Sequence, residues 1–199
     1  MPHLHTSARH SGLPAKKMEK RVDRLLNFVK ARVSPISQLS ATIALEHFTA
    51  IMADRLLRKP DLIAGADARL TALWRWHALE ETEHKAVAFD VYRTVMGKNV
   101  RAYVVRTGGL IAATVIFLGF VYAYQRELVN ADKTMGRWQG FGNYMKFLLG
   151  KSGFVRDLVG PWLDYFKPGF HPWDHDNRHF LDEIDSLVEE LRSYDLAAA

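Results

Sequence analysis

The stretch from Trp76 to His84, which reads Trp-His-Ala-Leu-Glu-Glu-Thr-Glu-His, contains two imidazoles and three carboxylates. Residues on a helix advance by about 100° each, so His77 and His84 lie only about 20° apart. Glu80 and Glu81 fall on either side of that line. Imidazole nitrogens and carboxylate oxygens on one face are typical ligands of iron, manganese and zinc. The stretch therefore indicates a divalent metal site.

The rest of that helix face is apolar, which predicts that the polar cluster is buried. Its apolar members are Leu70, Leu73, Trp74, Ala88, Val91 and Val95. Burying His and Glu side chains costs on the order of several kcal/mol unless they are paired, protonated or bound to a cation. A bound metal accounts for the cluster most simply.

Glu81 and His84 also form a Glu-x-x-His motif, the spacing by which ferritin-like bundles hold iron or manganese together with a Glu from another helix. Glu46 is the natural partner, because its own helix face is otherwise apolar and consists of Leu39, Ile43, Ala50, Ala53 and Leu57. We expect Glu46, Glu81 and His84 to bind the metal, with His77 as a further ligand lining the same cavity. Glu83 faces away from the cluster and is expected to be solvated.

Two features of this region also allow interpretations without a metal. Glu81 and Lys85 have the i,i+4 spacing of an ordinary surface ion pair. His47 stands about 100° from Glu46 on its helix, which suits either a residue that supports a metal ligand or a partly exposed core histidine.

The composition predicts one all-α domain over residues 16–199. The 199 residues are 48% hydrophobic and 12% aromatic, enough for a substantial core, and residues 1–15 are expected to be a disordered tail or the remnant of a truncated helix. Cap residues and periodicity predict helices over residues 16–33, 35–58, 67–97 and 177–194, with a short helix over 152–166 broken at Gly160-Pro161. The last helix, apolar on one face, is expected to dock onto the bundle.

The chain contains no cysteine, which excludes disulfides, thiolate metal sites and cysteine nucleophiles. A carboxylate-rich ligand set favours iron or manganese over zinc. The formal net charge of +5 comes with no nucleic-acid-binding motif, so we expect no nucleic-acid partner. An anionic membrane surface or an acidic amphiphilic substrate explains the charge better. Residues 1–10 lack the apolar core of a secretory signal, which favours a cytoplasmic location.

Residues 108–124 form an uncharged and almost wholly apolar run of 17 residues, expected to be the fourth helix. A membrane span typically needs about 20 such residues, so the run is marginal for spanning. Arg101, Arg106 and Arg126 flank it, as they would at a membrane interface. The alternatives are a buried central helix or the wall of an apolar substrate tunnel. We favour a buried or membrane-apposed helix over a true span.

Three segments together resemble the bacterial family of predicted metal-dependent hydrolases: residues 45–50, 73–92 and 168–174, which read LEHFTA, LWRWHALEETEHKAVAFDVY and PGFHPWD. The resemblance covers the chain after about residue 16 and implies a ferritin-like fold. It supports Glu46, His77, Glu80, Glu81 and His84 as the site. Family members also begin with two helices that resemble a second metal half-site. Pro2 stands where the Glu of that motif belongs, so we expect the N-terminal part of the family domain to be missing and the bundle to be partial.

Three functions follow as hypotheses. In the leading one, the metal activates water on a small hydrophobic substrate beside residues 108–124, with Glu80 accepting the proton and His77 assisting. In the second, a ferritin-like di-iron centre oxidises the substrate with oxygen. In the third, the chain is an inactive metal-binding or membrane-associated bundle. A second copy could complete a two-metal site, which makes a homodimer a candidate assembly.

Overall fold

The computed structural model describes residues 15–131, 136–150 and 154–197. These three ranges are helical and contain no strand, which confirms the all-α class. The expected tail over residues 1–15 lies outside the described residues except for Ala15, the first residue of a helix. The elements are α2 (Ala15–Arg32), α3 (Pro35–Arg58), a 3-10 turn (Pro60–Ile63), α4 (Ala68–His84), α5 (Val87–Met96), α6 (Val100–Ala131), α7 (Arg137–Leu149), α8 (Phe154–Asp164), 3-10 turns (Pro172–Asp174, Arg178–Glu183) and α9 (Ile184–Ala197).

Local cap residues set several of these boundaries, as predicted. The Ser34 side chain accepts a hydrogen bond from the backbone N–H of Ser37, and Pro35 occupies the first turn of α3. Asp67 accepts from the N–H groups of Arg69 and Leu70 at the start of α4. Gly97 ends α5 with a φ of 70°, a conformation that favours glycine.

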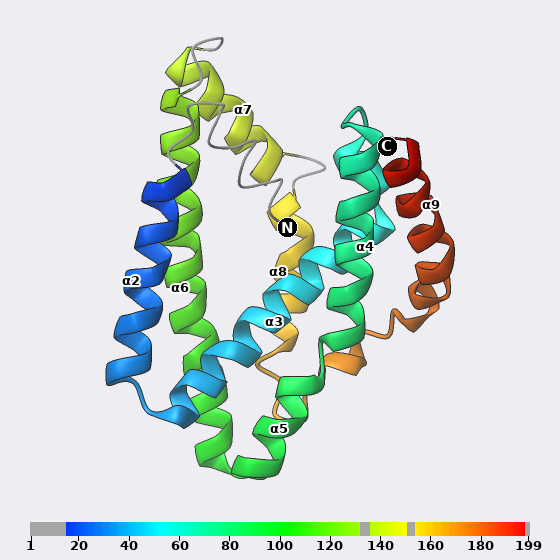
Figure 1. Ribbon diagram of the computed structural model, residues 1–199. Coiled ribbons are helices and arrows are strands. Elements are labelled where there is room, and N and C mark those ends of the chain that lie inside the picture. Colours follow the sequence, from blue (N-terminus) through cyan, green and yellow to red (C-terminus); the bar gives the residue numbers. More distant parts are fainter. Residues whose placement is uncertain (1–14, 132–135, 151–153, 198–199) are drawn as a thin grey trace.

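Helix α3 crosses the middle of the molecule, with α2 and α6 side by side on one flank and α4 and α9 on the other (Figure 1). The main core joins α3, α5, α6 and α8 to the loop after α8. It includes Ile43, Phe48, Phe89, Tyr92, Leu110, Tyr165 and Phe170. A second cluster packs Leu187 of α9 against Ala72 and Leu79 of α4, which confirms the docking role of the C-terminal helix.

The single helix expected over residues 67–97 is wrong, because the chain turns at Lys85 and Ala86 between α4 and α5. The turn lets Phe89 and Tyr92 enter the main core, where both are almost fully buried. The Tyr92 hydroxyl donates to the carbonyl oxygen of Ala102 at 2.7 Å and so links α5 to α6. Core packing has overridden the continuous helical pattern.

The expected break at Gly160-Pro161 is also wrong, because α8 continues through Pro161. A proline inside a helix removes one backbone hydrogen bond. Here the carbonyl oxygen of Pro161 accepts from Nε2 of His47 at 3.1 Å, which ties this part of α8 to α3.

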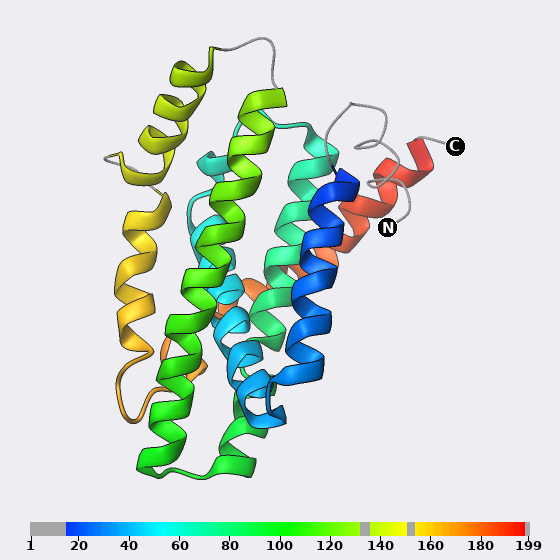
Figure 2. The same cartoon turned by 90° about the vertical axis from the view of Figure 1, so that its left-hand side faces the viewer.

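The apolar residues 108–124 belong to α6, and the structure does not bury this stretch as a central helix. Of the 18-residue apolar window in α6, 17% is buried, and α6 is long and apolar enough to cross a membrane by length and composition alone. The buried residues of α6, all in its N-terminal half, are Ala102, Arg106, Thr107, Leu110 and Ala113. Figure 2 shows α6 on the face turned toward the viewer, with α2 to its right and α7 and α8 to its left.

Candidate metal centre

His77, Glu80 and Glu81 lie together on α4. Nδ1 of His77 is 3.6 Å from Oε2 of Glu80, and its Nε2 is 3.5 Å from Oε1 of Glu81. These are contacts between residues one turn apart on the same helix, as the spacing predicts. The imidazole therefore lies between two carboxylates, all three groups being partly exposed to solvent.

Glu46 approaches this helix from α3, and its Oε2 atom is buried with no hydrogen-bond partner among the described residues. Burial raises the pKa of the Glu46 carboxyl. A hydrogen bond from the backbone N–H of Ala88 lowers that pKa, the charge of Glu81 raises it, and the charge of His84 lowers it. Glu46 thus lies near the start of α5, where a helix N-terminus favours an anion, and within electrostatic reach of both motif residues.

The donor types suit a divalent cation, because they are carboxylate oxygens and imidazole nitrogens. The unpartnered Oε2 of Glu46 is the kind of buried oxygen that a cation would satisfy. Within the described part of the chain, however, no three His, Asp or Glu side chains are close enough together to hold an ion. Binding would require side-chain rotation on α3 and α4. The assignment of Glu46, Glu81, His84 and His77 as ligands stays a prediction.

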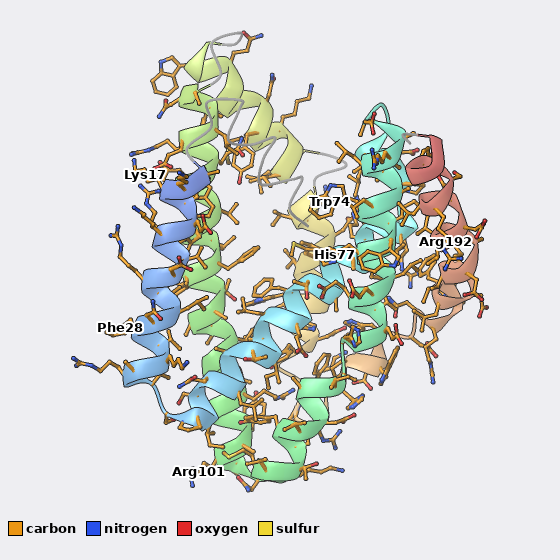
Figure 3. All side chains as sticks on the ribbon, viewed as in Figure 1. Lys17, Phe28, Trp74, His77, Arg101 and Arg192 are labelled. Atoms are coloured by element: carbon orange, nitrogen blue, oxygen red, sulfur yellow. The ribbon has the colours of Figure 1, made fainter. Side chains whose placement is uncertain are left out.

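The face of α4 and α5 that carries the cluster is open, and the expectation that it is buried is wrong. Trp74 is 54% exposed and Val91 is 50% exposed, and Leu70 and Val95 are exposed as well. Trp74 and His77 point to the same side of α4, away from α9 (Figure 3), with ring centroids 6.0 Å apart. His84 is exposed, as is Glu83, for which solvation was expected. The polar cluster therefore sits within an exposed apolar surface.

The buried side of α4 is a different ridge, which the sequence analysis missed. Its members are Ala72, Ala78, Leu79 and Thr82, followed by Lys85 and Ala86 at the turn. Their spacing of three, four or seven residues was visible in the sequence. Small side chains concealed it, because the larger residues Leu70, Trp74 and Val91 give the opposite face the stronger apolar pattern.

Lys85 is not the surface partner of Glu81. Its side chain is 4% exposed, and Nζ donates to the carbonyl oxygen of His175 and to Oδ1 of Asn177, both at 2.6 Å. Burial lowers the pKa of Lys85 to about 8. Asn177 in turn donates to Oδ1 of Asp54 at 3.0 Å. This network fixes the loop before α9 against α3 and α4, beside a cavity of about 350 Å³.

His47 is a core histidine, more buried than expected. It is 3% exposed, its Nε2 bonds to the Pro161 carbonyl, and burial lowers its pKa to about 4. Its ring packs against Tyr165 and Phe170, with centroids 4.8 and 5.3 Å away. These contacts give it a role in packing rather than in supporting a metal ligand.

Arg106, expected to flank a membrane-facing helix, is instead 4% exposed. Its Nη2 donates to the carbonyl oxygen of Lys167 at 2.9 Å, and its guanidinium carbon lies 4.9 Å from the centroid of the Tyr165 ring. Arg106 therefore fixes the N-terminal part of α6 to the loop after α8. Only Arg101 and Arg126 remain as exposed flanks of the apolar run.

Other polar residues of the loop before α9 are engaged in hydrogen bonds and in one ion pair. Nε2 of His171 lies 3.0 Å from Oδ1 of Asp90, and Asp176 pairs with Arg178 at 2.7 Å. His175 pairs with Asp164 at 2.9 Å. These contacts favour a structural role for the loop.

A family described as “Predicted metal-dependent hydrolase” matches residues 3–176. The match begins at residue 3, so the expected loss of the N-terminal part of the family domain is not supported. No curated protein and no solved structure matches the chain. The ferritin-like arrangement of the helices therefore stays a prediction.

Proposed function

Because the chain belongs to the family of predicted metal-dependent hydrolases, we propose that it hydrolyses a small hydrophobic substrate at the cluster on α3 and α4. The observation that carries this proposal is the buried Oε2 of Glu46, which has no hydrogen-bond partner among the described residues and lies beside the partly exposed imidazole-carboxylate cluster of His77 and Glu81. A cation would satisfy that oxygen and draw the cluster together. Iron and manganese fit this oxygen-rich set better than zinc.

In this proposal Glu46, Glu81, His84 and His77 hold the ion. A divalent ion held by these residues would supply the nucleophile, because it would lower the pKa of a coordinated water. Glu80 is the proton acceptor, because its partly exposed carboxylate contacts the His77 imidazole and faces solvent. His77 would bind the ion through the ring nitrogen that faces Glu81 and orient the Glu80 carboxylate through the other ring nitrogen.

The apolar surroundings of the cluster support a hydrophobic substrate. Trp74 lies one turn before His77 on the same side of α4, and Val91 and Val95 continue the exposed apolar surface on α5. A substrate with an apolar group can pack there while its reacting carbon lies over the cluster. These exposed residues favour a substrate position on α4 and α5 over one beside residues 108–124.

The test combines metal content with a stability readout. Purified protein is stripped with chelator, and manganese, ferrous iron or zinc is added while the melting temperature and the hydrolysis of p-nitrophenyl butyrate are followed. We expect manganese or ferrous iron to raise the melting temperature and to be required for turnover. At a concentration of about 100 times Kd, a ligand that binds only the folded state adds about 2.7 kcal/mol.

Glu46→Gln and Glu81→Gln should each abolish that thermal shift, and His84→Ala should weaken it. Glu83→Gln is the matched control, since Glu83 is an exposed carboxylate in the same turn of α4. Equal losses in Glu83→Gln and Glu81→Gln would refute the assigned ligands. Metal binding without turnover would identify a non-catalytic metal protein, and turnover that requires oxygen would identify an oxidase.

A further inference from the structure

A hollow of about 500 Å³ lies between the end of α5, the start of α6 and the loop after α8. The junction of α5 and α6 is at the lower end of the molecule in Figure 1. The hollow has largely aromatic walls, which include Phe89, Tyr92, Tyr103 and Phe170. Its volume falls within the range of about 300 to 1,000 Å³ that is usual for small-molecule sites. None of the candidate metal ligands lines it, so it is separate from the centre on α3 and α4.

The charged side chains that line the hollow are all cations, namely Arg93, Lys98 and Arg106. Arg93 is partly exposed and Lys98 is exposed, whereas Arg106 is almost fully buried. Within the described part of the chain, none of the three forms an ion pair with an acidic side chain. The lining therefore combines positive charge with apolar rings and has no carboxylate to balance the charge.

Arg106 is the buried cation of this hollow, and its hydrogen bonding is incomplete. Nη2 donates to the Lys167 carbonyl, but Nη1 is buried and has no hydrogen-bond partner among the described residues. The guanidinium carbon lies 4.9 to 5.8 Å from the ring centroids of Phe89, Tyr103, Tyr165 and Phe170. Ring faces attract a cation but do not neutralise its charge. Burial lowers the pKa of Arg106, and the like charge of Arg93 also lowers it. An anion would satisfy Nη1 and relieve this repulsion.

The start of α6 adds to the positive field in the hollow. Oδ1 of Asn99 accepts a hydrogen bond from the backbone N–H of Ala102 at 2.9 Å, and both residues line the hollow. The first turn of α6 contains no acidic residue. The N-terminus of a helix carries a partial positive charge that favours an anion. This terminus supports the cations, whereas the buried Nη1 of Arg106 is the observation that points to a ligand.

From these observations we propose that the hollow between α5 and α6 binds a small amphiphilic carboxylate, whose charged group contacts Arg106 and Arg93 and whose apolar body packs against the aromatic walls. A monoanion suits the site better than a phosphate dianion, because Nη2 of Arg106 is already engaged and one buried cation balances one negative charge. Since no candidate metal ligand lines the hollow, the proposal is independent of the hydrolytic one.

The test is calorimetric titration of the full chain with octanoate, octan-1-ol and acetate. We expect octanoate to bind saturably. Octan-1-ol has the same tail without the charge and should bind at least about tenfold more weakly, because hydrogen bonds to charged groups are the stronger ones. Acetate has the charge without the tail and should bind at least about a hundredfold more weakly, since each buried methylene contributes a factor of roughly four.

Three variants locate the site. Arg106→Met should weaken octanoate binding at least about tenfold and make octanoate and octan-1-ol bind alike. Arg93→Gln should weaken octanoate binding about fivefold and leave octan-1-ol unaffected. Arg101→Gln is the matched control, because Arg101, labelled in Figure 3, is an exposed arginine at the start of α6 that does not line the hollow. It removes the same charge as Arg93→Gln and should bind octanoate as wild type does.

Circular dichroism establishes that each variant is folded, and Arg93→Gln decides the matter if Arg106→Met does not fold. Equal binding of octanoate and octan-1-ol by the wild type would overturn the proposal, as would equal losses in Arg93→Gln and Arg101→Gln. Glu81→Gln should bind octanoate normally. Loss of binding in that variant would place octanoate at the candidate metal centre and refute a separate site. Octanoate binding that Arg93→Gln weakens and Glu81→Gln does not would support this site even if the chain hydrolyses nothing.

Discussion

Gly108 and Gly109 are neighbours in α6, yet alanine should have opposite effects at the two positions. A Cβ built at Gly109 would clash with Oγ of Ser40 and lie 3.0 Å from its Cβ and 3.1 Å from its backbone carbon. A Cβ at Gly108 would meet nothing within 4 Å. Gly109 therefore marks a close approach of α6 to α3, and Gly108 does not.

The expected free energies follow from that difference. Overpacking costs about 1 to 3 kcal/mol. Displacing Ser40 also threatens its hydrogen bond to the carbonyl oxygen of Val105, 2.7 Å long and worth about 1 kcal/mol. The helix-propensity gain of alanine over glycine returns about 1 kcal/mol. Gly109→Ala should thus destabilise the protein by about 1 to 3 kcal/mol, because the cost exceeds the gain.

Gly108→Ala should instead stabilise the protein by about 0.5 to 1 kcal/mol, since only the propensity gain applies. The unfolding free energies of the two variants should then differ by about 1.5 to 4 kcal/mol, and their melting temperatures by about 3 to 16 °C for a domain of this size. Urea unfolding followed by circular dichroism measures the difference. Ser40→Ala in the Gly109→Ala background should restore only part of the loss, because the contacts with Cβ and the backbone remain. Equal melting temperatures for the two glycine variants would refute the proposed contact between α3 and α6.

Two further substitutions probe the polar contacts that hold the core elements together. Lys85→Met keeps an unbranched side chain but leaves the His175 carbonyl and the Asn177 amide oxygen without their donor. In urea titrations it should reduce the unfolding free energy by about 2 to 4 kcal/mol. The control Lys98→Met, at an exposed position, should change that free energy by less than about 0.5 kcal/mol. Tyr92→Phe removes the buried hydrogen bond to the Ala102 carbonyl and should lower the unfolding free energy by about 1 to 2 kcal/mol. A variant that melts at the same temperature as wild type would count against that bond.

Local signals in the sequence predict the helix boundaries well, because caps act within a few residues. Ser34, Asp67 and Gly97 each occupy the expected position. The turn at Lys85 and Ala86 and the continuation of α8 through Pro161 escaped prediction. Both depend on contacts with residues distant in the sequence, and periodicity carries no information about those contacts.

For the candidate site, helical geometry correctly predicts that His77 lies near Glu80 and Glu81, because a single helix fixes that relation. The expected burial of the cluster fails because α4 has two apolar faces. The face with small residues packs tightly, and Trp74 and its neighbours remain exposed. Because the exposed face carries the larger apolar side chains, its apolar pattern is stronger in the sequence than that of the buried face. The position of Glu46 relative to Ala88 depends on how α3 crosses α5, which one sequence does not specify.

The contacts of Lys85 also bear on the order in which the protein can complete its fold during synthesis. Its two acceptors, His175 and Asn177, lie 90 and 92 residues later in the chain. At translation rates of about 5 to 20 residues per second, these acceptors are synthesised roughly 5 to 20 seconds after Lys85. Until then, α4 and α5 can form locally, but the junction between them has neither its buried partners nor the cover of the later loop. The newly made N-terminal half therefore depends on the last fifth of the chain to become native, and a ribosome pause between the two would prolong exposure of that junction.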